Sequence, residues 1–573
     1  MRYLFYINFI VISLCIVSCT EKKTNALVVH ITHEPEDIHP TNGSSALRAE
    51  LILYTQLSLL KINYQSGNLI PCVAEKLPSI STDGLVYNYQ LDSNLTWDNK
   101  RPISDKDICF TAKANCCLLT NNAATKSNWD NLKNITAHNA QQIDVVMKMA
   151  SSYNTWMWVE CPILQEAFYD KEKTLSKYNI EQLRDSAFIA THADIKKWAD
   201  NFNDTKYYNN PTYMDGAGVY KITQWNKGEN IVLEKKKNHW SEDTRYAWWD
   251  KAGSDKIIFK INSNNASAML ELKNGTMDVS TCLDYASFSE LANDKSFTQT
   301  HTTELADTYN YTYIALNTKP DTKKHPPLFT EPSVRKAMAM LIPYNQINQL
   351  LFAGKCKRAV GPVSVLKKDF NSALKPIEEN SVNAKQLLSQ AGWTDTDGDH
   401  ILDKNNNNKK INFEFSINYM SGQKQWEDIA KIIAEAFQKI GITVMLNPLE
   451  YNGFLGSAMN HDFDMTLGAW QTNTQPDDFS QLWHSNAWQS NGFNFTGFGN
   501  KDSDALIDSI NHSVNDDSRI TLSKQFQQMV YNQQHYIFLF SQVRRVVINK
   551  KWAGATIYNE YPGVLLNTLY LKK

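Results

Sequence analysis

The sequence predicts an α/β fold, in which helices pack on β-sheets. The first observation is the alternation over residues 309–316, where three tyrosines and an alanine occupy every second position, as is typical of a strand. The second is the order strand, helix, strand over residues 412–446, whose middle segment, residues 424–440, carries an amphipathic stripe. The third is size, because 573 residues with 42% hydrophobic side chains can bury large cores without disulfides or metals.

The amino terminus predicts export and a lipid anchor. Residues 3–17 form a long apolar run after a single charge, and the run is shorter than the ~20 apolar residues that cross a membrane. The run ends in IVSC, which resembles a bacterial lipobox, and its last residue is Cys19. We therefore expect a signal peptide over residues 1–18 and a lipidated tether over residues 19–25 that begins at Cys19. The alternative is an ordinary signal peptide followed by a chance cysteine.

Composition argues against several classes of partner. The formal net charge is −2 at pH 7, whereas nucleic-acid binding requires a strongly basic face, so we expect no nucleic-acid partner. The nine cysteines show no CxxC spacing, and Cys116 and Cys117 are adjacent, which is poor geometry for one metal or a relaxed disulfide. The sequence therefore predicts no cofactor.

The first elements can be placed in chain order. Residues 26–31 read as a short apolar strand, and a turn-rich loop leads from it to a helix at residues 45–57. Ser104 is expected to cap a helix from residue 105 onward. A strand at residues 256–261 and a helix at residues 266–274 complete an α/β half.

The second half opens with the strand at residues 309–316 and a proline-rich break. Ser333 is a candidate N-cap for a helix whose apolar stripe includes Val334, Met338 and Leu341. We expect Arg335 to point away from that stripe.

Two clusters contain residue types that bind metals, and neither has a complete motif. The first, near the amino terminus, has no compact two-ligand spacing. In the second, Gly398 stands between the second and third acids, and no glutamate closes a calcium loop at its twelfth position. We therefore interpret them as a strand with a solvated loop and an acidic hairpin turn, and predict no metal. The clusters are His30, His33, Glu34, Asp37 and His39, and Asp395, Asp397, Asp399 and Asp403.

Several segments, taken together, resemble one known family. They are NLIPCVAEKLPSISTDGLVYNY from residue 68, MDGAGVYKITQWNKGENIVLEKKKNHW from residue 214, and YIALNTK, FTEPSVRKAMAMLI and INQLLFAGKCKRAVGPV after residue 312. They are similar to family 5 of the bacterial extracellular solute-binding proteins, the peptide, dipeptide and nickel type of ABC importers. The resemblance implies the two-lobed periplasmic binding protein fold, type II and cluster C-like, with a subdomain in the first lobe.

The resemblance also implies domain boundaries. A hinge is expected near residues 314–317, where the chain leaves the first lobe. The expected parts are a first lobe at residues 26–317 with an inserted subdomain at about 66–211, a second lobe at residues 318–540, and a return to the first lobe at residues 541–573.

The same resemblance supplies candidate ligand contacts. Ser44 and Ser45 stand where the family's first loop and helix edge the cleft. The segment DMTLGAWQTNTQPDDF, from residue 464, resembles the family's aromatic-then-acidic cleft wall. When Trp470 is aligned with the aromatic residue of the family, Asn473 stands where peptide binders carry an aspartate. The alternative role for Trp470 is packing in the core. Because asparagine brings no charge, Asp477 or its neighbour could take the role of that aspartate.

The implied function is capture without chemistry. The family resemblance predicts a monomeric lipoprotein of the cell envelope, periplasmic and anchored through Cys19, that captures a small solute and delivers it to an ABC permease. It favours an oligopeptide, with an oligosaccharide or metal chelate as alternatives. An exported hydrolase is the rival class, although the chain contains neither G-x-S-x-G nor H-E-x-x-H. An all-helical sugar-capturing lipoprotein conflicts with the dense strand alternation.

Overall fold

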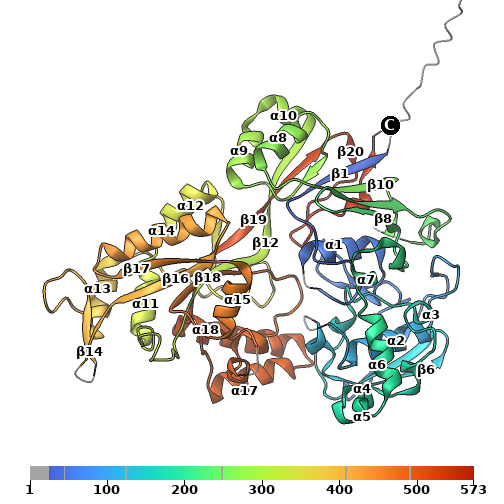
Figure 1. Ribbon diagram of the computed structural model, residues 1–573, viewed down its shortest axis with the longest axis horizontal. Helices are drawn as coiled ribbons and strands as arrows, with labels where there is room; N and C mark the ends of the chain where they lie inside the picture. Colours follow the sequence, from blue (N-terminus) through green and yellow to red (C-terminus); the bar gives the residue numbers. More distant parts are fainter. Residues whose placement is uncertain are drawn as a thin grey trace, which may run out of the picture.

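The structure is a computed structural model that describes residues 25–43, 45–122, 125–246, 250–406, 409–489 and 492–572. Within these residues the chain forms an 11-stranded mixed sheet flanked by helices, as the predicted α/β class requires. Figure 1 shows two bodies joined by β12 (His301–Leu316) and β19 (Tyr536–Asn549), which we call the first and second lobes. Ten of its strands follow the order β17-β16-β18-β12-β19-β11-β1-β10-β9-β8, and the eleventh, β13, pairs with β19 outside this order.

The first lobe is built around β1 (Ala26–Ile31), which pairs in parallel with β10 and β11. Its bounds equal the predicted ones because the apolar run is short and ends at a turn-rich loop. Helix α1 (Ala46–Thr55) follows, and α8 to α10 lie together at the top of Figure 1. The other elements here are β8 (Tyr220–Asn226), β9 (Asn230–Lys235), β10 (Lys256–Ile261), α8 (Asn265–Lys273), β11 (Val279–Ser280), α9 (Tyr285–Asn293), α10 (Lys295–Thr300), β20 (Trp552–Ala553) and β21 (Tyr570–Leu571).

A separate four-stranded sheet, of order β4-β5-β7-β6, forms the subdomain beside α1. Helix α2 (Asp105–Cys116) begins with the predicted capping box of Ser104 and Asp107. Trp129 and Trp158 are buried in its core with edge-to-face rings 5.1 Å apart. The elements of this region are β2 (Leu60–Ile62), β3 (Leu69–Pro71), β4 (Ser79–Ile80), β5 (Val86–Gln90), β6 (Leu132–Asn139), β7 (Gln142–Met147), α3 (Glu166–Tyr169), α4 (Ile180–Arg184), α5 (Ser186–Ala190), α6 (Ala193–Phe202) and α7 (Lys206–Asn209).

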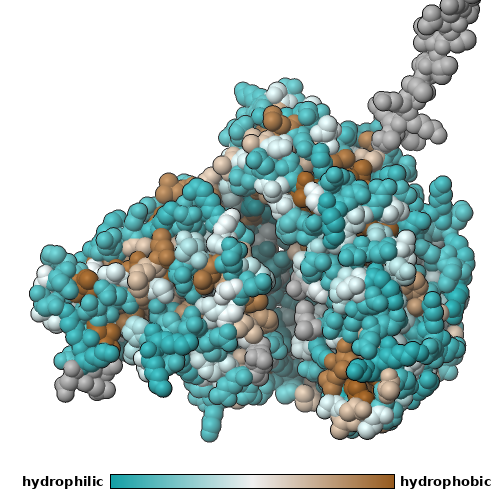
Figure 2. All heavy atoms as spheres, viewed as in Figure 1, coloured by the Kyte–Doolittle hydropathy of each residue, from teal (hydrophilic) through white to brown (hydrophobic). Residues whose placement is uncertain are grey.

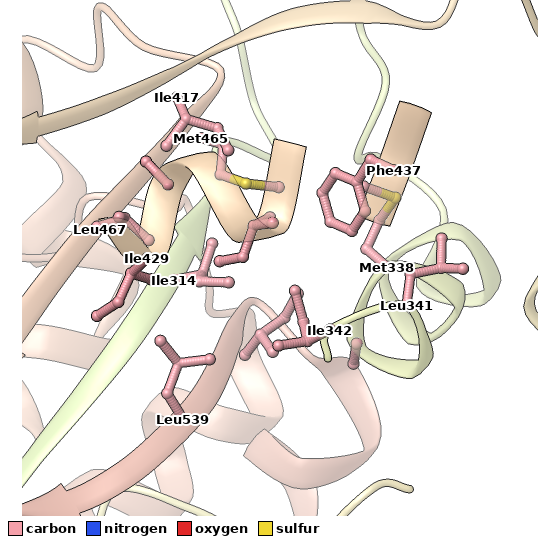
Figure 3. Close-up of a cluster of buried hydrophobic side chains, with 14 of the residues drawn as sticks. Ile314, Met338, Leu341, Ile342, Ile417, Ile429, Phe437, Met465, Leu467 and Leu539 are labelled. Carbon is pink, nitrogen blue, oxygen red and sulfur yellow. The ribbon is translucent and has the colours of Figure 1, made fainter. Parts of the chain in front are cut away.

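The second lobe packs helices on β16, β17 and β18. The amphipathic stripe of α14 (Lys424–Gln438) supplies Ile429, which is fully buried among side chains from α11 and the strands (Figure 3). The other elements are α11 (Pro332–Met340), α12 (Tyr344–Phe352), β13 (Lys357–Arg358), α13 (Ser381–Gln390), β14 (Asp403–Asn406), β15 (Lys409–Asn412), β16 (Glu414–Met420), β17 (Thr443–Leu449), α15 (Tyr451–Met459), β18 (Met465–Trp470), α16 (Ser480–Trp483), α17 (Lys501–Asn511) and α18 (Asp516–Gln533).

Strands β12 and β19 run antiparallel through both lobes. Their pairing shifts register between Asp307 and Tyr311 and again between Tyr311 and Tyr313, and β12 from Tyr311 onward also pairs with β18. The irregular stretch therefore ends directly before the residues predicted as the hinge. The hinge and the lobe boundaries stay predictions.

Helix α11 differs from the sequence prediction at its start. It begins at Pro332, after Glu331 as N-cap, and not after Ser333, because proline lacks an N–H that would need a partner in the first turn. Arg335 is 2% exposed, whereas the sequence placed it in solvent. The guanidinium can be buried because it donates hydrogen bonds to carbonyl oxygens, those of Phe329, Thr330 and Gln533.

Candidate functional site

A deep groove separates the two lobes on the face shown in Figure 2. Between the lobes lies a cavity of about 570 Å³, whose residues come from both of them. The first lobe contributes α1, the chain around Met157 and Tyr561, and the second lobe contributes Gln471 and Asn473 from the loop after β18. The volume is in the range of ~300–1,000 Å³ that is typical of small-molecule sites.

The loop after β18 also holds the lobes together. The backbone N–H of Thr474 donates to the carboxylate of Glu560 at 2.8 Å. The hydroxyl of Tyr153, in the subdomain, donates to the carbonyl oxygen of Asp477 at 2.7 Å. These bonds cross from one lobe to the other, so the cavity is bounded by direct contact between them.

Two of the predicted ligand contacts line this cavity. Ser45 is the N-cap of α1, and its hydroxyl accepts a hydrogen bond from the Arg48 N–H at 3.3 Å. Asn473 lies on the opposite wall, and its Oδ1 accepts from the N–H of Gln475 at 2.9 Å. Ser44 lies outside the described residues. The structure thus brings Ser45 and Asn473 to one cavity, and their contact with a ligand stays a prediction.

Trp470 and Asp477 are not among the described residues that line the cavity. The Trp470 ring packs parallel to Tyr313 and Phe495, with centroids 6.1 Å away in each case, inside the second lobe. Asp477 forms a 2.7 Å ion pair with Lys367, and the two side chains are only 15% and 4% exposed. Burial raises the pKa of Asp477, while the ammonium of Lys367 opposes that shift. Asp477 therefore already has a cation as its partner.

Among the residues that the structure describes, four charged side chains line the cavity, two of each sign, and each of the two cations already has an acid as its partner. Arg48 Nε lies 3.4 Å from a carboxylate oxygen of Asp37, and Lys61 Nζ lies 2.8 Å from Asp250. Neither acid partner lines this cavity. The positive charges of Arg48 and Lys61 are thus balanced by acids that lie outside the cavity lining.

The two acids of the cavity wall have hydroxyl partners instead. Tyr561 donates to the Glu50 carboxylate at 3.0 Å, and Tyr64 donates to the Glu160 carboxylate at 3.0 Å. Within the part of the chain that the structure describes, no Lys, Arg or His nitrogen lies within 4.0 Å of either acid. Burial raises the pKa of Glu50 to about 7. Sequence reasoning missed both acids, although Glu50 stands three residues after Leu47 on the apolar stripe of its helix.

The acidic hairpin between α13 and β15 brings three of its carboxylates together, and the absence of a metal there stays a prediction. Oxygens of Asp395, Asp397 and Asp403 lie within 4.8 Å of one another. The ammonium of Lys410 pairs with Asp397 and lies 3.6 Å from Asp403. Asp403 also accepts hydrogen bonds from the N–H and hydroxyl of Thr396. These contacts satisfy the carboxylates as a hairpin turn does.

The family of this chain follows from a sequence profile. The profile of bacterial extracellular solute-binding proteins, family 5 (middle), matches residues 68–491. The chain belongs to that family. The predicted family is thereby confirmed, as is the prediction of a substrate-binding protein of a transporter, not an enzyme. Among the described residues, no helix is both long and apolar enough to span a bilayer.

Similar proteins agree with this assignment. The oligopeptide-binding protein AppA of Bacillus subtilis is 29% identical over 334 residues, which are 57% of this chain and 56% of AppA. A dipeptide-binding protein of Escherichia coli is 22% identical over 540 residues, covering 91% of this chain and 90% of the relative.

Solved structures give the fold. AppA from Bacillus subtilis in complex with a nonapeptide has a TM-score of 0.75 at 21% identity, covering 96% of this chain and 99% of AppA. NikA from Brucella suis in complex with Fe(III)-EDTA has a TM-score of 0.76 at 18% identity, covering 96% of this chain and all of NikA. The predicted periplasmic binding protein fold is confirmed.

Proposed function

We propose that this protein captures an oligopeptide in the cavity between its lobes and delivers it to an ABC permease in the membrane. The observation that carries the proposal is the cavity itself, which is lined by both lobes and lies where closure of two lobes would enclose a solute. Backbone groups and polar side chains of its walls, such as those of Ser45 and Asn473, would hold the ligand's main chain, and water would fill unoccupied side-chain space.

The choice of a peptide rests on the relatives. AppA is named for oligopeptides and the Escherichia coli relative for dipeptides, and their matches extend over 57% and 91% of this chain. NikA, seen with Fe(III)-EDTA, shares the fold at a similar TM-score. A metal chelate is therefore the second ligand class to test.

Attachment to the membrane is a further part of the proposal. We infer that Cys19 carries the lipid and that the tether to residue 25 places the binding lobes next to the permease. A single acyl chain binds membranes only reversibly, whereas a diacylated cysteine holds stably. Cys19→Ala should abolish labelling by radioactive palmitate. Wild-type protein that takes up no label, or a Cys19→Ala variant that is still labelled, would contradict the anchor.

The ligand class can be tested directly on purified protein. Native mass spectrometry would reveal a co-purified solute and show whether the protein is a monomer, as we expect. Thermal melting with pools of two- to nine-residue peptides, and with nickel–histidine or Fe(III)-EDTA, would compare the two classes. A reversible rise in melting temperature with peptides, without their cleavage, supports the proposal. A rise with the chelates alone overturns it.

A further inference from the structure

The second lobe contains a cavity of about 250 Å³ that shares no lining residue with the cavity between the lobes. It lies where the chain leaves β12 and enters β19, beside α11, α17 and α18, which Figure 1 shows in the lower part of that lobe. Among the described residues, its lining includes no Asp or Glu and three basic side chains, those of Lys319, Arg335 and His535. The fixed charge of this cavity is therefore positive.

The buried guanidinium of Arg335 has hydrogen-bond partners but no counter-charge. Its acceptors are backbone carbonyl oxygens and, at 3.2 Å, the side-chain oxygen of Gln533, and all of them are neutral. Burial lowers the pKa of Arg335 to about 10, and among the described residues no acid raises it. Glu331, four residues earlier, is paired with Lys404 at 2.6 Å. Burying a charge without a partner of opposite sign is costly, so an anion in this cavity would stabilise the site.

His535 connects the parts of the site. Its Nδ1 lies 3.2 Å from the hydroxyl of Thr318, the residue before Lys319. Its ring centroid lies 5.1 Å from that of Phe498. Burial lowers the pKa of His535, and the positive charges of Arg335 and Lys319 lower it further. Both cations therefore act on the same imidazole ring.

The loop before α17 supplies backbone donors. Among the described residues, the N–H groups of Phe498 and Gly499 donate to no acceptor. The exposed Lys319 side chain lies against Gly497, where an added Cβ would be 2.9 Å from the lysine Cδ. The Asn500 side chain already accepts two N–H groups of the first turn of α17. The loop and the lysine, not the helix end, therefore complete the site.

We propose that this cavity binds a phosphate group through Lys319, Arg335 and the backbone N–H groups of Phe498 and Gly499. Phosphate oxygens accept charge-assisted hydrogen bonds, and all but one of the guanidinium N–H groups already have acceptors, which leaves one for the ligand. Unpaired backbone N–H groups in a loop form anion sites in other proteins. A neutral solute would leave the buried charge uncompensated, and a cation would be repelled.

The phosphate could be free inorganic phosphate or part of a lipid headgroup, and calorimetry of the purified protein separates the two. The probes are inorganic phosphate, glycerol phosphate and a short-chain, soluble phosphatidylglycerol, each compared with chloride at the same ionic strength. We expect one saturable site in the wild type. Lys319→Gln should weaken binding about 10- to 100-fold, which is the loss of one charge-assisted bond.

A matched control separates the site from general attraction between charges. Lys323→Gln removes the same charge from an exposed lysine four positions further on, which does not line the cavity, and should leave the affinity unchanged. Arg335→Gln should abolish binding, and its melting transition shows whether the variant is folded. If it is not folded, the comparison of Lys319→Gln with Lys323→Gln decides alone.

Each outcome has one meaning. Binding of inorganic phosphate alone supports a site for the free anion, and binding of the phosphatidylglycerol supports a headgroup site. The absence of saturable binding for all three probes, or an equal loss in Lys319→Gln and Lys323→Gln, overturns the inference. Peptide capture does not depend on this result, because the two cavities share no lining residue.

Discussion

The ion pair of Asp477 and Lys367 gives a test of whether Asp477 stabilises the second lobe or contacts the ligand. We expect Asp477→Asn to destabilise the second lobe, because it removes the negative charge beside the buried Lys367 ammonium and leaves that ammonium with the neutral carbonyl oxygen of Gln475, 2.8 Å away. Removing one partner of a buried pair costs about 3–5 kcal/mol. For a cooperative unit of roughly 150–250 residues this lowers the melting temperature by about 6–20 °C.

The assay is differential scanning calorimetry of the ligand-free protein. Asp478→Asn is the matched control, because Asp478 is exposed and accepts a hydrogen bond from the Ser480 N–H that an asparagine can also accept. It should change the melting temperature by no more than about 2 °C.

A double-mutant cycle makes the test quantitative. Lys367→Met and Asp477→Leu together should cost much less than the sum of the two single changes, since apolar side chains of similar size can replace a buried pair. If the single costs simply add, the ion pair does not stabilise the lobe. If Asp477→Asn leaves stability unchanged and weakens peptide binding at least tenfold, Asp477 is a ligand contact and the structural role is wrong.

Three further substitutions test a hydrogen bond between the lobes, a buried acid and a core residue of the second lobe. Tyr153→Phe removes a hydrogen bond between the lobes that is worth about 1 kcal/mol, so the population of open molecules should rise about fivefold. Small-angle scattering should then show a larger radius of gyration. Tyr178→Phe, which removes a hydrogen bond within the first lobe, should leave the radius of gyration unchanged. Burial raises the pKa of Glu560 to about 7, so the folded state keeps a proton that the unfolded state loses above about pH 4.5. The contribution of Glu560 should therefore lower the unfolding free energy by about 3 kcal/mol between pH 4.5 and pH 7. Denaturant titrations of Glu560→Gln should lack this contribution to the pH dependence. Ile429→Ala should cost about 2–5 kcal/mol and lower the calorimetric transition of the second lobe; an unchanged transition would contradict its place in the core.

Much of the fold could be predicted because local patterns specify it. The strand at residues 26–31 and the Ser104 cap of α2 agree with the structure, since period and capping depend on neighbours in sequence. Arg335 shows the limit of such reasoning. Helical spacing placed it in solvent, whereas in the folded chain its guanidinium donates to the carbonyl oxygens of Phe329, Thr330 and, from a distant part of the sequence, Gln533.

The candidate site was predicted only in part. Resemblance to the family found Ser45 and Asn473, which line the cavity, and also Asp477, whose charge is taken up by Lys367. It did not find Glu50, because an acid inside an amphipathic helix looks like an ordinary surface residue unless its surroundings are known.

The sequence by itself determined the fold class, the family and most element positions, because these depend on periodicity and on the order of short segments along the chain. Tertiary structure alone decided which charges are paired and which face the cavity. The physical reason is that an ion pair or hydrogen bond depends on distances of a few ångströms. Residues as far apart in the chain as Glu50 and Tyr561 reach such distances only when the chain is folded.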